Sequence, residues 1–323
     1  MGCEQMIRIA VLDDYQGVAL EMADWSVLDG RAEVVVFDEV LGDENAVASA
    51  LAEFDGVVAM RERTAFPGSL LARLPRLRLL VTTGMRNKAI DLAAAEQLGI
   101  MVCGTRSRAQ STVELTWALI LGRSRHLVTE AGNVATGGWQ TTVGNGLAGS
   151  TLGIIGLGRI GSAVARVGSA FGMRVLAWSQ NLTSERAQVA GAELVGLAEL
   201  LSASDVVTIH QVLSDRTRDL IGAAELATMR PTALLVNTSR GPIVSADALV
   251  AAVRGGVIAG AALDVYDQEP LPADHPIRST PGILATPHIG YVTRDVYELF
   301  YGEAVEDVVS FLDGSPVRQI SPQ

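Results

Sequence analysis

Short apolar runs separated by polar and turn-forming residues fill the first hundred positions of the chain. Runs of this length that are rich in Val, Ile and Leu are typical of buried strands, and two stretches between them have the spacing of helices. Gly99 stands where the second helix would end. Because strands alternate with helices, the pattern predicts a parallel sheet. The predicted strands cover residues 7–12, 34–37, 57–60, 79–82 and 101–103, and the helices cover 45–54 and 91–98.

The same alternation returns between residue 151 and about residue 287. It predicts a second doubly wound sheet, in which Gly172 ends the first helix. Longer helical patterns flank this region at 111–125 and 293–312, and each is expected to carry the chain from one domain to the other. The strands predicted here are 152–155, 174–178, 206–210, 233–236, 258–263 and 283–285, and the helices are 160–171, 197–201, 223–229 and 246–254.

A glycine-rich turn, GLGRIG at 156–161, joins the strand at 152–155 to the helix that follows it. Within a strand–helix–strand unit, this G-x-G-x-x-G spacing indicates dinucleotide binding. The first glycine makes the tight turn, the second lets the backbone approach a pyrophosphate, and the third lets helix and strand pack closely. The helix N-terminus adds free N–H groups and partial positive charge. The residues expected to contact the dinucleotide are Gly156, Gly158, Arg159, Ile160 and Gly161.

One part of the usual dinucleotide pattern is missing. An acidic residue normally stands about 20 residues after the glycines, where it accepts hydrogen bonds from the adenosine ribose. Ser179 occupies that position. Without a carboxylate, nothing repels a 2′-phosphate, and Ser179 or Asn181 can hydrogen-bond one, yet the nearest arginine is Arg186. The cofactor is therefore expected to be NAD or NADP, and the choice stays open.

These observations predict an α/β protein of two Rossmann-like or flavodoxin-like, doubly wound parallel-sheet domains with a cleft between them. Residues 1–112 and 293–323 are expected to form the substrate-binding (catalytic) domain. Residues 113–292 are expected to form the NAD(P)-binding domain. A length of 323 residues is sufficient for two hydrophobic cores.

Chemically capable side chains follow three of the strands predicted after the glycine turn. Carboxyl ends of parallel strands meet at one edge of a sheet, so Arg240, Asp264, Glu269 and His288 are expected to gather near the nicotinamide. An arginine grips a carboxylate bidentately, a histidine moves a proton near neutral pH, and a carboxylate orients that histidine. Taken singly, Arg240 can be explained as a surface ion-pair residue, Glu269 as a turn carboxylate and His288 as a core histidine. No residue is assigned to a metal.

Two patches of the first domain are candidates for substrate contact. The turn Thr83-Gly84-Met85 follows a strand end, where backbone N–H groups can hold a small carboxylate. Arg61 follows another strand end and can help to hold an anionic substrate. An ordinary connecting turn and a solvated surface cluster are the alternatives for these two patches.

Composition excludes several classes of partner. A net charge of −11 and a pI near 4.9 argue against nucleic acid and against an anionic membrane face. No apolar run approaches the ~18 residues of a membrane span. Two cysteines, Cys3 and Cys103, are too few for a disulfide framework, so a cytoplasmic location is expected. The segment 132–150, rich in Gly and Thr, resembles an extended arm, and Trp139 and Val143 within it suggest contact with a partner subunit.

With these segments assembled, the sequence resembles the D-isomer-specific 2-hydroxyacid dehydrogenase family. The motifs that carry the resemblance stand in the family's order, and together they cover essentially the whole catalytic chain. They are ELTWALILGRSRHL at 114–127, GLGRIG at 156–161, VVTIH at 206–210, NTSRGPIV at 237–244, LDVYDQEP at 263–270 and TPHIG at 286–290.

The resemblance implies roles for individual residues. Arg240, Glu269 and His288 match the catalytic arginine, glutamate and histidine, and Asp264 matches a residue that holds the nicotinamide carboxamide. The turn at Thr83 matches the loop whose backbone receives the substrate carboxylate. Ser179 and the sequence MRNKA at 85–89 depart from the family's usual pattern, which leaves cofactor and substrate size in doubt. Further cofactor contacts are expected at Thr112, His210 and Ser239.

The function expected from all this is reversible hydride transfer between NAD(P) and C2 of a small 2-oxo or 2-hydroxy acid, of the glyoxylate or hydroxypyruvate type. A homodimer is expected from the family and from the 132–150 segment. Two alternatives remain: a non-enzymatic protein that senses NAD(H), and another oxidoreductase on the same scaffold, such as one acting on phosphite.

Overall fold

The structure is a computed structural model that describes residues 6–322, so Cys3 lies outside the described part. The chain divides into two compact units. Unit 1 comprises the chain up to Arg108 and again from Val292, and unit 2 comprises Ala109–Tyr291. The chain therefore passes between the units twice.

Unit 1 is built on a five-stranded sheet in the order β2-β1-β3-β4-β5, with every neighbouring pair parallel. This is the flavodoxin-like strand order. The parallel sheet expected from the alternating pattern is confirmed. Its strands are Ile7–Val11 (β1), Ala32–Val36 (β2), Gly56–Ala59 (β3), Leu79–Thr82 (β4) and Met101–Gly104 (β5).

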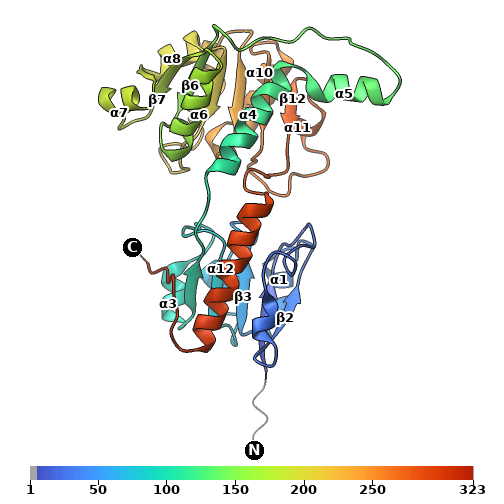
Figure 1. Cartoon of the computed structure of the whole chain (residues 1–323), viewed down its shortest axis with the longest axis vertical. Coiled ribbons are helices and arrows are strands. Elements are labelled where there is room, and N and C mark those ends of the chain that lie inside the picture. Colours follow the sequence, from blue (N-terminus) through green and yellow to red (C-terminus); the bar gives the residue numbers. More distant parts are fainter. Residues whose placement is uncertain (1–5, 323) are drawn as a thin grey trace, which may run out of the picture. The chain divides into compact units, whose positions relative to one another are not determined.

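Helices cover this sheet, and the core of unit 1 gathers side chains from both kinds of element (Figure 1). Phe66, Leu70, Leu71 and Leu80 are each at most 1% exposed within it. The long helix predicted at 293–312 is present as α12 and packs on β4 and β5. The helices of unit 1 are the 3₁₀ helix Trp25–Leu28 (η1), Glu44–Leu51 (α1), Gly68–Leu71 (α2), Leu92–Gln97 (α3) and Arg294–Leu312 (α12).

Unit 2 contains a seven-stranded sheet, again parallel throughout, in the order β12-β11-β10-β9-β6-β7-β8. The order reverses between β6 and β9, which is the point where ligands bind in open α/β sheets. Its strands are Thr151–Ile155 (β6), Arg174–Trp178 (β7), Glu193–Leu194 (β8), Val206–Ile209 (β9), Leu234–Asn237 (β10), Gly260–Leu263 (β11) and Ile283–Ala285 (β12).

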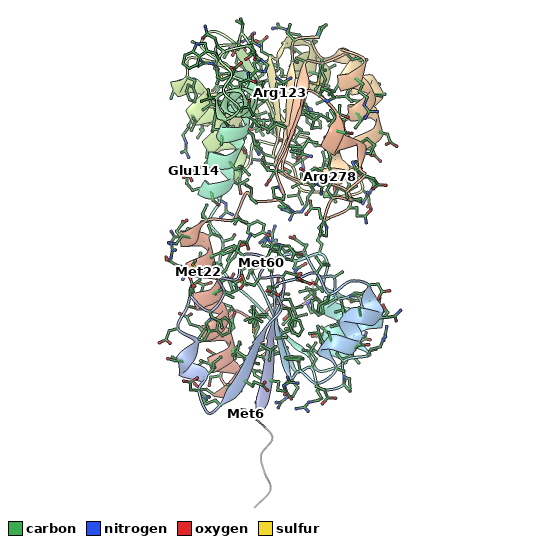
Figure 2. The ribbon with its side chains drawn as sticks, turned by 90° about the vertical axis from the view of Figure 1, so that its right-hand side faces the viewer. Met6, Met22, Met60, Glu114, Arg123 and Arg278 are labelled. Atoms are coloured by element: carbon green, nitrogen blue, oxygen red, sulfur yellow. The ribbon has the colours of Figure 1, made fainter. Side chains whose placement is uncertain are left out.

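Successive residues of these strands point to opposite faces, and each face has its own core. Helices α8, α9 and α10 cover one face, and α4 and α6 cover the other (Figure 1). Arg123 of α4 fastens the second face, because its guanidinium donates to the carbonyls of Ala259 and Gly282 beside β11 and β12 (Figure 2). The helices of unit 2 are Gln110–Ser124 (α4), Leu127–Ala135 (α5), Arg159–Ala170 (α6), Ser184–Val189 (α7), Leu197–Ala203 (α8), Ala223–Thr228 (α9), Gly241–Ile243 (η2, 3₁₀), Ala246–Arg254 (α10) and Pro276–Ser279 (α11).

The prediction that residues 132–150 form an extended arm is wrong at its start, because α5 continues through Ala135. The extended chain begins only after the helix. The carboxylate of Glu130 fastens it by accepting from the N–H and hydroxyl groups of Thr141 and Thr142. These hydrogen bonds lower the pKa of Glu130 to about 2. The Gly and Thr content of residues 132–150 cannot reveal that a later segment of the chain hydrogen-bonds to the helix at Glu130.

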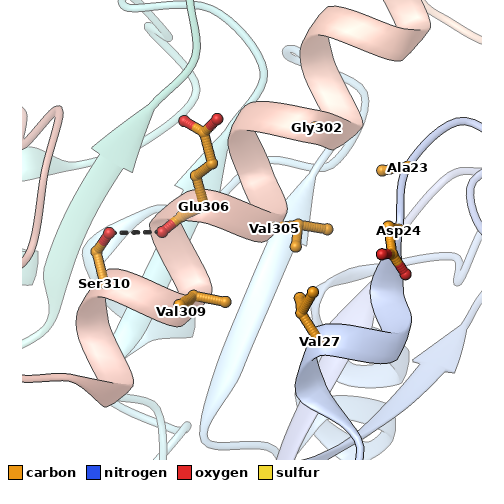
Figure 3. Close-up of a pocket in the computed structure, with 8 residues that line it drawn as sticks. All are labelled: Ala23, Asp24, Val27, Gly302, Val305, Glu306, Val309 and Ser310. Carbon is orange, nitrogen blue, oxygen red and sulfur yellow. Dashed lines mark hydrogen bonds between the residues drawn. The ribbon is translucent and has the colours of Figure 1, made fainter.

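A shallow apolar groove lies on unit 1 between η1 and α12. Val27 of η1 faces Val305 and Val309 of α12 across it (Figure 3). Within residues 6–322, no helix is both long and apolar enough to cross a membrane.

A buried charge cluster joins α12 to the end of the chain. Arg318 donates to the carboxylate of Asp307 and to the backbone carbonyl of Glu303. Glu303 in turn accepts from the backbone and the guanidinium of Arg106, which lies just before the chain enters unit 2. Asp307 is fully buried, and its Oδ2 has no hydrogen-bond partner among the described residues. The cluster therefore attaches two segments to α12: the C-terminal residues around Arg318, and the residues around Arg106 that lead into unit 2.

Burial raises the pKa of Asp307 to about 7, against the lowering effect of Arg318, while the nearby acids Glu303 and Glu306 raise it further. The thiol of Cys103 on β5 also faces this carboxylate, and its own pKa is raised to about 12, chiefly by burial. The folded chain consequently holds a proton on Asp307 at pH values where the unfolded chain does not. Stability contributed in this way is present at mildly acidic pH and is lost as the pH rises through about 7.

Asp307→Asn should remove this titration while keeping the shape of the side chain. The melting temperature of the variant relative to wild type should therefore increase between pH 5 and pH 8. Thermal unfolding at several pH values measures this difference. Asp313→Asn is the control, since Asp313 is an exposed acid in an ion pair with Arg31 at the end of the same helix. Melting curves for Asp307→Asn that run parallel to wild type at every pH would contradict the assignment.

Candidate active site

The candidate residues of unit 2 follow a single row of strand ends. Trp178, Ile155, Ile209, Asn237, Leu263 and Ala285 are register partners across six adjacent strands, so β7, β6, β9, β10, β11 and β12 end at the same level. The glycine turn, Ser179, His210, Arg240, Asp264 and His288 come within a few residues of these ends. The topology therefore brings them to one edge of the sheet, as expected from the sequence.

The glycine turn has the geometry that its pattern predicts. Gly156 has φ +101°, and a Cβ on it would lie 2.5 Å from the carbonyl oxygen of His210. A Cβ on Gly161 would lie 2.1 Å from the carbonyl oxygen of Gly156. Gly158 precedes α6, and a Cβ there would meet no atom within 4 Å. Packing thus requires glycine at positions 156 and 161, whereas Gly158 borders open space.

The first two residues of α6 differ in their surroundings. Arg159 is exposed, and Ile160 is half-buried against the core of unit 2. Within α6 the free N–H groups of the first turn face outward beyond Gly158, which suits a pyrophosphate. The open space at Gly158 and this helix N-terminus therefore fit a dinucleotide.

His210 lies at the end of β9, beside the glycine turn. Its Nε2 is 3.0 Å from the hydroxyl of Thr208. Its Nδ1 is enclosed and has no hydrogen-bond partner among the described residues. Burial lowers the pKa of His210 to about 3, so the imidazole is neutral at pH 7. An enclosed nitrogen without a partner is costly unless a ligand supplies one, which is a second observation that fits a bound cofactor.

Ser179 follows β7 and contacts the glycine turn directly. Its hydroxyl oxygen accepts a hydrogen bond of 3.0 Å from the backbone N–H of Leu157. The residue that replaces the usual acid is thus part of the turn's own hydrogen-bond network.

Asp264 organises the segment that carries His288. The residue is 1% exposed. Its carboxylate accepts from the hydroxyl of Thr286 at 2.6 Å and from the backbone N–H groups of Ile289 and Gly290, both at 2.8 Å. Burial raises the pKa of Asp264, while these hydrogen bonds and nearby His288 act in the opposite direction. A buried carboxylate with three donors from one short segment holds that segment in a single conformation.

His288 and Glu269 form a close pair. Nδ1 of His288 lies 2.5 Å from Oε2 of Glu269, and both side chains remain partly exposed. The backbone of His288 has φ +54°, a left-handed conformation that is unusual for a non-glycine residue. Oε1 of Glu269 accepts from the backbone N–H of Tyr266, which fixes the carboxylate. With Nδ1 engaged, Nε2 of His288 is the nitrogen left to exchange a proton with a ligand.

Arg240 and its neighbours complete the edge. The guanidinium of Arg240 donates to the carbonyl of Ser239, whose hydroxyl donates to the carbonyl of Ile209. A Cβ on Gly241 would lie 2.0 Å from the backbone of Tyr266, so the Arg240 loop packs directly on the loop that leads to Glu269. Thr112 on α4 donates to the carbonyl of Gly290 and so supports the His288 segment from the other side.

The candidate substrate turn belongs to unit 1. Gly84 has φ +101°, and its N–H donates to the hydroxyl of Thr105. Thr83 is fully buried and accepts from the backbone N–H of Arg61. The guanidinium of Arg61 donates to the carbonyl of Thr83, and a Cβ on Gly84 would lie 2.0 Å from its Nη1. Met85 is 41% exposed. The structure thus places the positively charged guanidinium of Arg61 directly against the backbone of this turn.

Sequence reasoning missed the residues that support the His288 segment. The hydroxyl of Tyr266 donates to the carbonyl of Thr286 at 2.8 Å, and Thr286 donates to Asp264. Burial raises the pKa of Tyr266, so its hydroxyl remains a donor. A signal existed in both cases, because Thr286 stands one residue and Tyr266 three residues after a predicted strand end. Among residues 6–322, no group of three or more His, Cys, Asp and Glu side chains is arranged to hold a metal ion.

The chain belongs to the D-isomer specific 2-hydroxyacid dehydrogenase family, whose NAD-binding domain profile matches residues 117–290. A glyoxylate reductase of Aeropyrum pernix is 42% identical over 255 residues, which are 76% of this chain and 76% of that protein. The predicted family is therefore confirmed.

Solved structures agree with this assignment. A putative D-3-phosphoglycerate dehydrogenase of Ralstonia solanacearum has a TM-score of 0.92 at 35% identity, with 98% of this chain and 97% of that chain covered. A phosphoglycerate oxidoreductase of Vibrio cholerae has a TM-score of 0.91 at 37% identity, with 96% and 100% covered. The fold class and the expected class of enzyme are confirmed. The protein is an oxidoreductase with an NAD-binding domain and acts on the CH–OH group of 2-hydroxy acids.

The two kinds of glycine in the turn should respond differently to alanine. Gly161→Ala places a methyl group against the Gly156 carbonyl, so it should lower the free energy of unfolding by the roughly 1–3 kcal/mol typical of overpacking, and the melting temperature with it. Gly158→Ala fills only open space, so it should leave the melting temperature unchanged while weakening NADH binding. Thermal unfolding and fluorescence titration with NADH measure the two effects. If Gly158→Ala bound NADH as wild type does, the open space would not be the dinucleotide site.

Proposed function

We propose that the protein interconverts small 2-oxo acids of the glyoxylate and hydroxypyruvate type with their 2-hydroxy acids. Arg240, Glu269 and His288 are the catalytic residues in this proposal. The observation that carries it is the 2.5 Å contact between His288 and Glu269, formed at the same sheet edge as the glycine turn. A histidine held by a carboxylate is a proton donor and acceptor near neutral pH.

Arg240 binds the substrate in the proposed mechanism. Its guanidinium offers several N–H donors in a planar fork, which matches a carboxylate and the adjacent carbonyl oxygen. Both groups of a 2-oxo acid are then fixed beside the imidazole of His288. The substrate carbonyl is polarised by the same charge, so its carbon becomes more electrophilic.

His288 moves the proton. When bound, the nicotinamide cofactor supplies the hydride that reaches C2 of the oxo acid, or accepts it in the reverse direction. In reduction, protonated His288 donates from Nε2 to the carbonyl oxygen, which becomes the hydroxyl group. In oxidation, neutral His288 accepts that proton. Glu269 stabilises the protonated ring and holds its Nδ1–H, which leaves Nε2 for the substrate.

Unit 1 is proposed to supply the substrate-binding domain and unit 2 the NAD(P)-binding domain. In unit 1, the turn of Thr83, Gly84 and Met85 is the proposed seat of the substrate carboxylate. Because the N–H of Gly84 already donates to Thr105, the backbone after Gly84 would supply the donors. Cofactor contacts are proposed for the glycine turn with Arg159 and Ile160, and for Thr112, Ser179, His210, Ser239 and Asp264.

A phosphorylated three-carbon acid is the second candidate substrate, and one observation favours it. Arg61 lies against the substrate turn, where its guanidinium can pair with a second anionic group of the substrate. Two of the solved relatives carry phosphoglycerate in their names. The glyoxylate type stands first because the relative with 42% identity is a glyoxylate reductase.

A homodimer is also proposed, with the arm and α5 as the contact surface. Side chains here are strongly exposed for apolar residues: Val128 is 65%, Trp139 74% and Val143 93% exposed. The arm is held in place by Glu130, so it presents these side chains as a formed surface. The cytoplasm remains the proposed location, and the free, buried Cys103 supports it. Cell fractionation that finds the protein in another compartment would contradict this proposal.

The experiment that tests the function is a panel of substrates under both cofactors. Glyoxylate, hydroxypyruvate, pyruvate, phenylpyruvate and 3-phosphohydroxypyruvate are each assayed with NADH and NADPH. The proposal expects the highest kcat/KM on glyoxylate or hydroxypyruvate. A preference for the phosphorylated acid that disappears in Arg61→Ala would establish the second candidate instead. Absence of turnover on every acid would refute both.

His288→Ala should lower kcat by ~10²–10⁴-fold, the usual contribution of a positioned general acid. NADH binding should stay close to wild type, because the glycine turn is untouched. Steady-state kinetics and a fluorescence titration measure the two quantities. Full turnover in this variant would exclude His288 as the proton donor.

Glu269→Gln should shift the pH at which reduction fades to a lower value. The uncharged amide keeps an acceptor for the Tyr266 N–H but no longer stabilises protonated His288. Profiles of kcat/KM against pH in the direction of reduction measure the shift. An unmoved profile would remove Glu269 from the pair.

Trp139→Asp should convert the dimer to a monomer. The indole is already exposed in the single chain, so the melting temperature of the monomer itself should change little. Light scattering distinguishes one copy of the 34.0 kDa chain from two. Val189→Asp, at an exposed valine of α7 outside the arm, is the control and should remain dimeric. A monomeric wild-type protein would contradict the proposal.

A further inference from the structure

The residues at the end of β7 help to decide whether the protein binds NAD(H) or NADP(H). This inference rests on the proposed dinucleotide site. Ser179 stands here, directly beside the glycine turn, with its hydroxyl oxygen 3.0 Å from the N–H of Leu157. An acid at this position normally accepts hydrogen bonds from the ribose hydroxyls and repels a 2′-phosphate. A serine carries no charge to repel that phosphate. Its oxygen already accepts one hydrogen bond, from Leu157, and its hydroxyl proton can be donated to a phosphate oxygen, which a carboxylate cannot do.

The segment that follows carries no negative charge either. Gln180, Asn181, Leu182 and Thr183 separate Ser179 from the short helix α7. Glu185 is the next acid. Its carboxylate is bound by its own backbone N–H and by the hydroxyl of Thr183, which together hold its pKa low. That carboxylate is therefore hydrogen-bonded within the first turn of α7.

Two arginines of the neighbouring helices α6 and α7 are exposed. Arg159 follows Gly158 at the start of α6, and Arg186 lies in α7. Among the residues that the structure describes, neither guanidinium forms an ion pair with a carboxylate. Arginine binds phosphate through two parallel hydrogen bonds, so these side chains can serve an additional phosphate group.

We infer that the protein binds NADP(H) at least as tightly as NAD(H), with the 2′-phosphate received by the Ser179 hydroxyl and by Arg186. The ribose of NAD(H) loses its acidic partner at this position, whereas the phosphate of NADP(H) gains a donor and a cation. Arg159 adds positive charge next to Gly158 of the glycine turn.

The test is equilibrium binding to the full-length wild-type protein, followed by the fluorescence of NADPH and of NADH. The inference expects a Kd for NADPH equal to or below that for NADH. Binding of NADH alone, or about tenfold tighter binding of NADH, would overturn the inference and leave the proposed function standing. Binding of neither nucleotide would overturn both.

Variants identify the side chains responsible. Ser179→Asp keeps an acceptor for Leu157 but adds a negative charge, so it should weaken NADPH roughly tenfold or more and leave NADH unchanged or tighter. Arg186→Ala should weaken NADPH and leave NADH unchanged. The control is Val40→Asp, which adds the same charge at a 49% exposed position of unit 1 and should affect neither nucleotide. Equal losses in Ser179→Asp and Val40→Asp, or NADPH binding that neither Ser179→Asp nor Arg186→Ala alters, would overturn the assignment.

Discussion

The buried carboxylate of Asp264 is the constraint on which the rest of the candidate site in unit 2 depends. A charge that is 1% exposed is costly unless donors surround it, and Thr286, Ile289 and Gly290 supply them from one short segment. His288 lies within that segment in a left-handed backbone conformation, which costs on the order of 1–3 kcal/mol for a non-glycine residue. The hydrogen bonds to Asp264 offset this strain. The backbone conformation therefore sets the direction of the His288 side chain, and the contact with Glu269 then fixes the orientation of its imidazole.

Much of this arrangement is predictable from sequence, because it follows from topology. Parallel strands end at one edge, so a residue that follows a strand belongs to that edge, and Arg240, Asp264 and His288 were found in this way. The glycine turn is predictable for the same reason, since a methyl group cannot fit at Gly156 or Gly161. Roles within the edge are less predictable. No local pattern reveals that the carboxylate of Asp264 accepts three hydrogen bonds from the Thr286–Gly290 segment of its own chain.

Prediction also fails where distant segments decide the local structure. Gly132 argues for a break in the helix, but α5 continues past it, and a later segment of the chain is tied back to Glu130. The turn at Thr83, Gly84 and Met85 also depends on a distant segment. The sequence predicts that its backbone N–H groups can hold a carboxylate, and the structure shows that the N–H of Gly84 donates to Thr105, which follows a neighbouring strand. Both outcomes depend on contacts between residues far apart in the chain, which hydrophobic periodicity does not contain.

Unit 1 shows that backbone strain near strand ends is not confined to His288. Three adjacent strands, β1, β3 and β4, are each followed by a residue with positive φ: Asp13, Arg61 and Gly84. Two of these are not glycine, so their conformations must be held by contacts. Thr64 and Tyr15 donate to the carboxylate of Asp13, and Arg61 is held by Thr83. Because strained non-glycine residues are retained mainly where a precise shape is needed, the carboxyl edge of this sheet is the part of unit 1 where the proposed function would have the substrate selected. Under that proposal the two sheets divide the work: the edge in unit 2 would fix the groups that move hydride and proton, and the edge in unit 1 would be the one that can differ in charge and size.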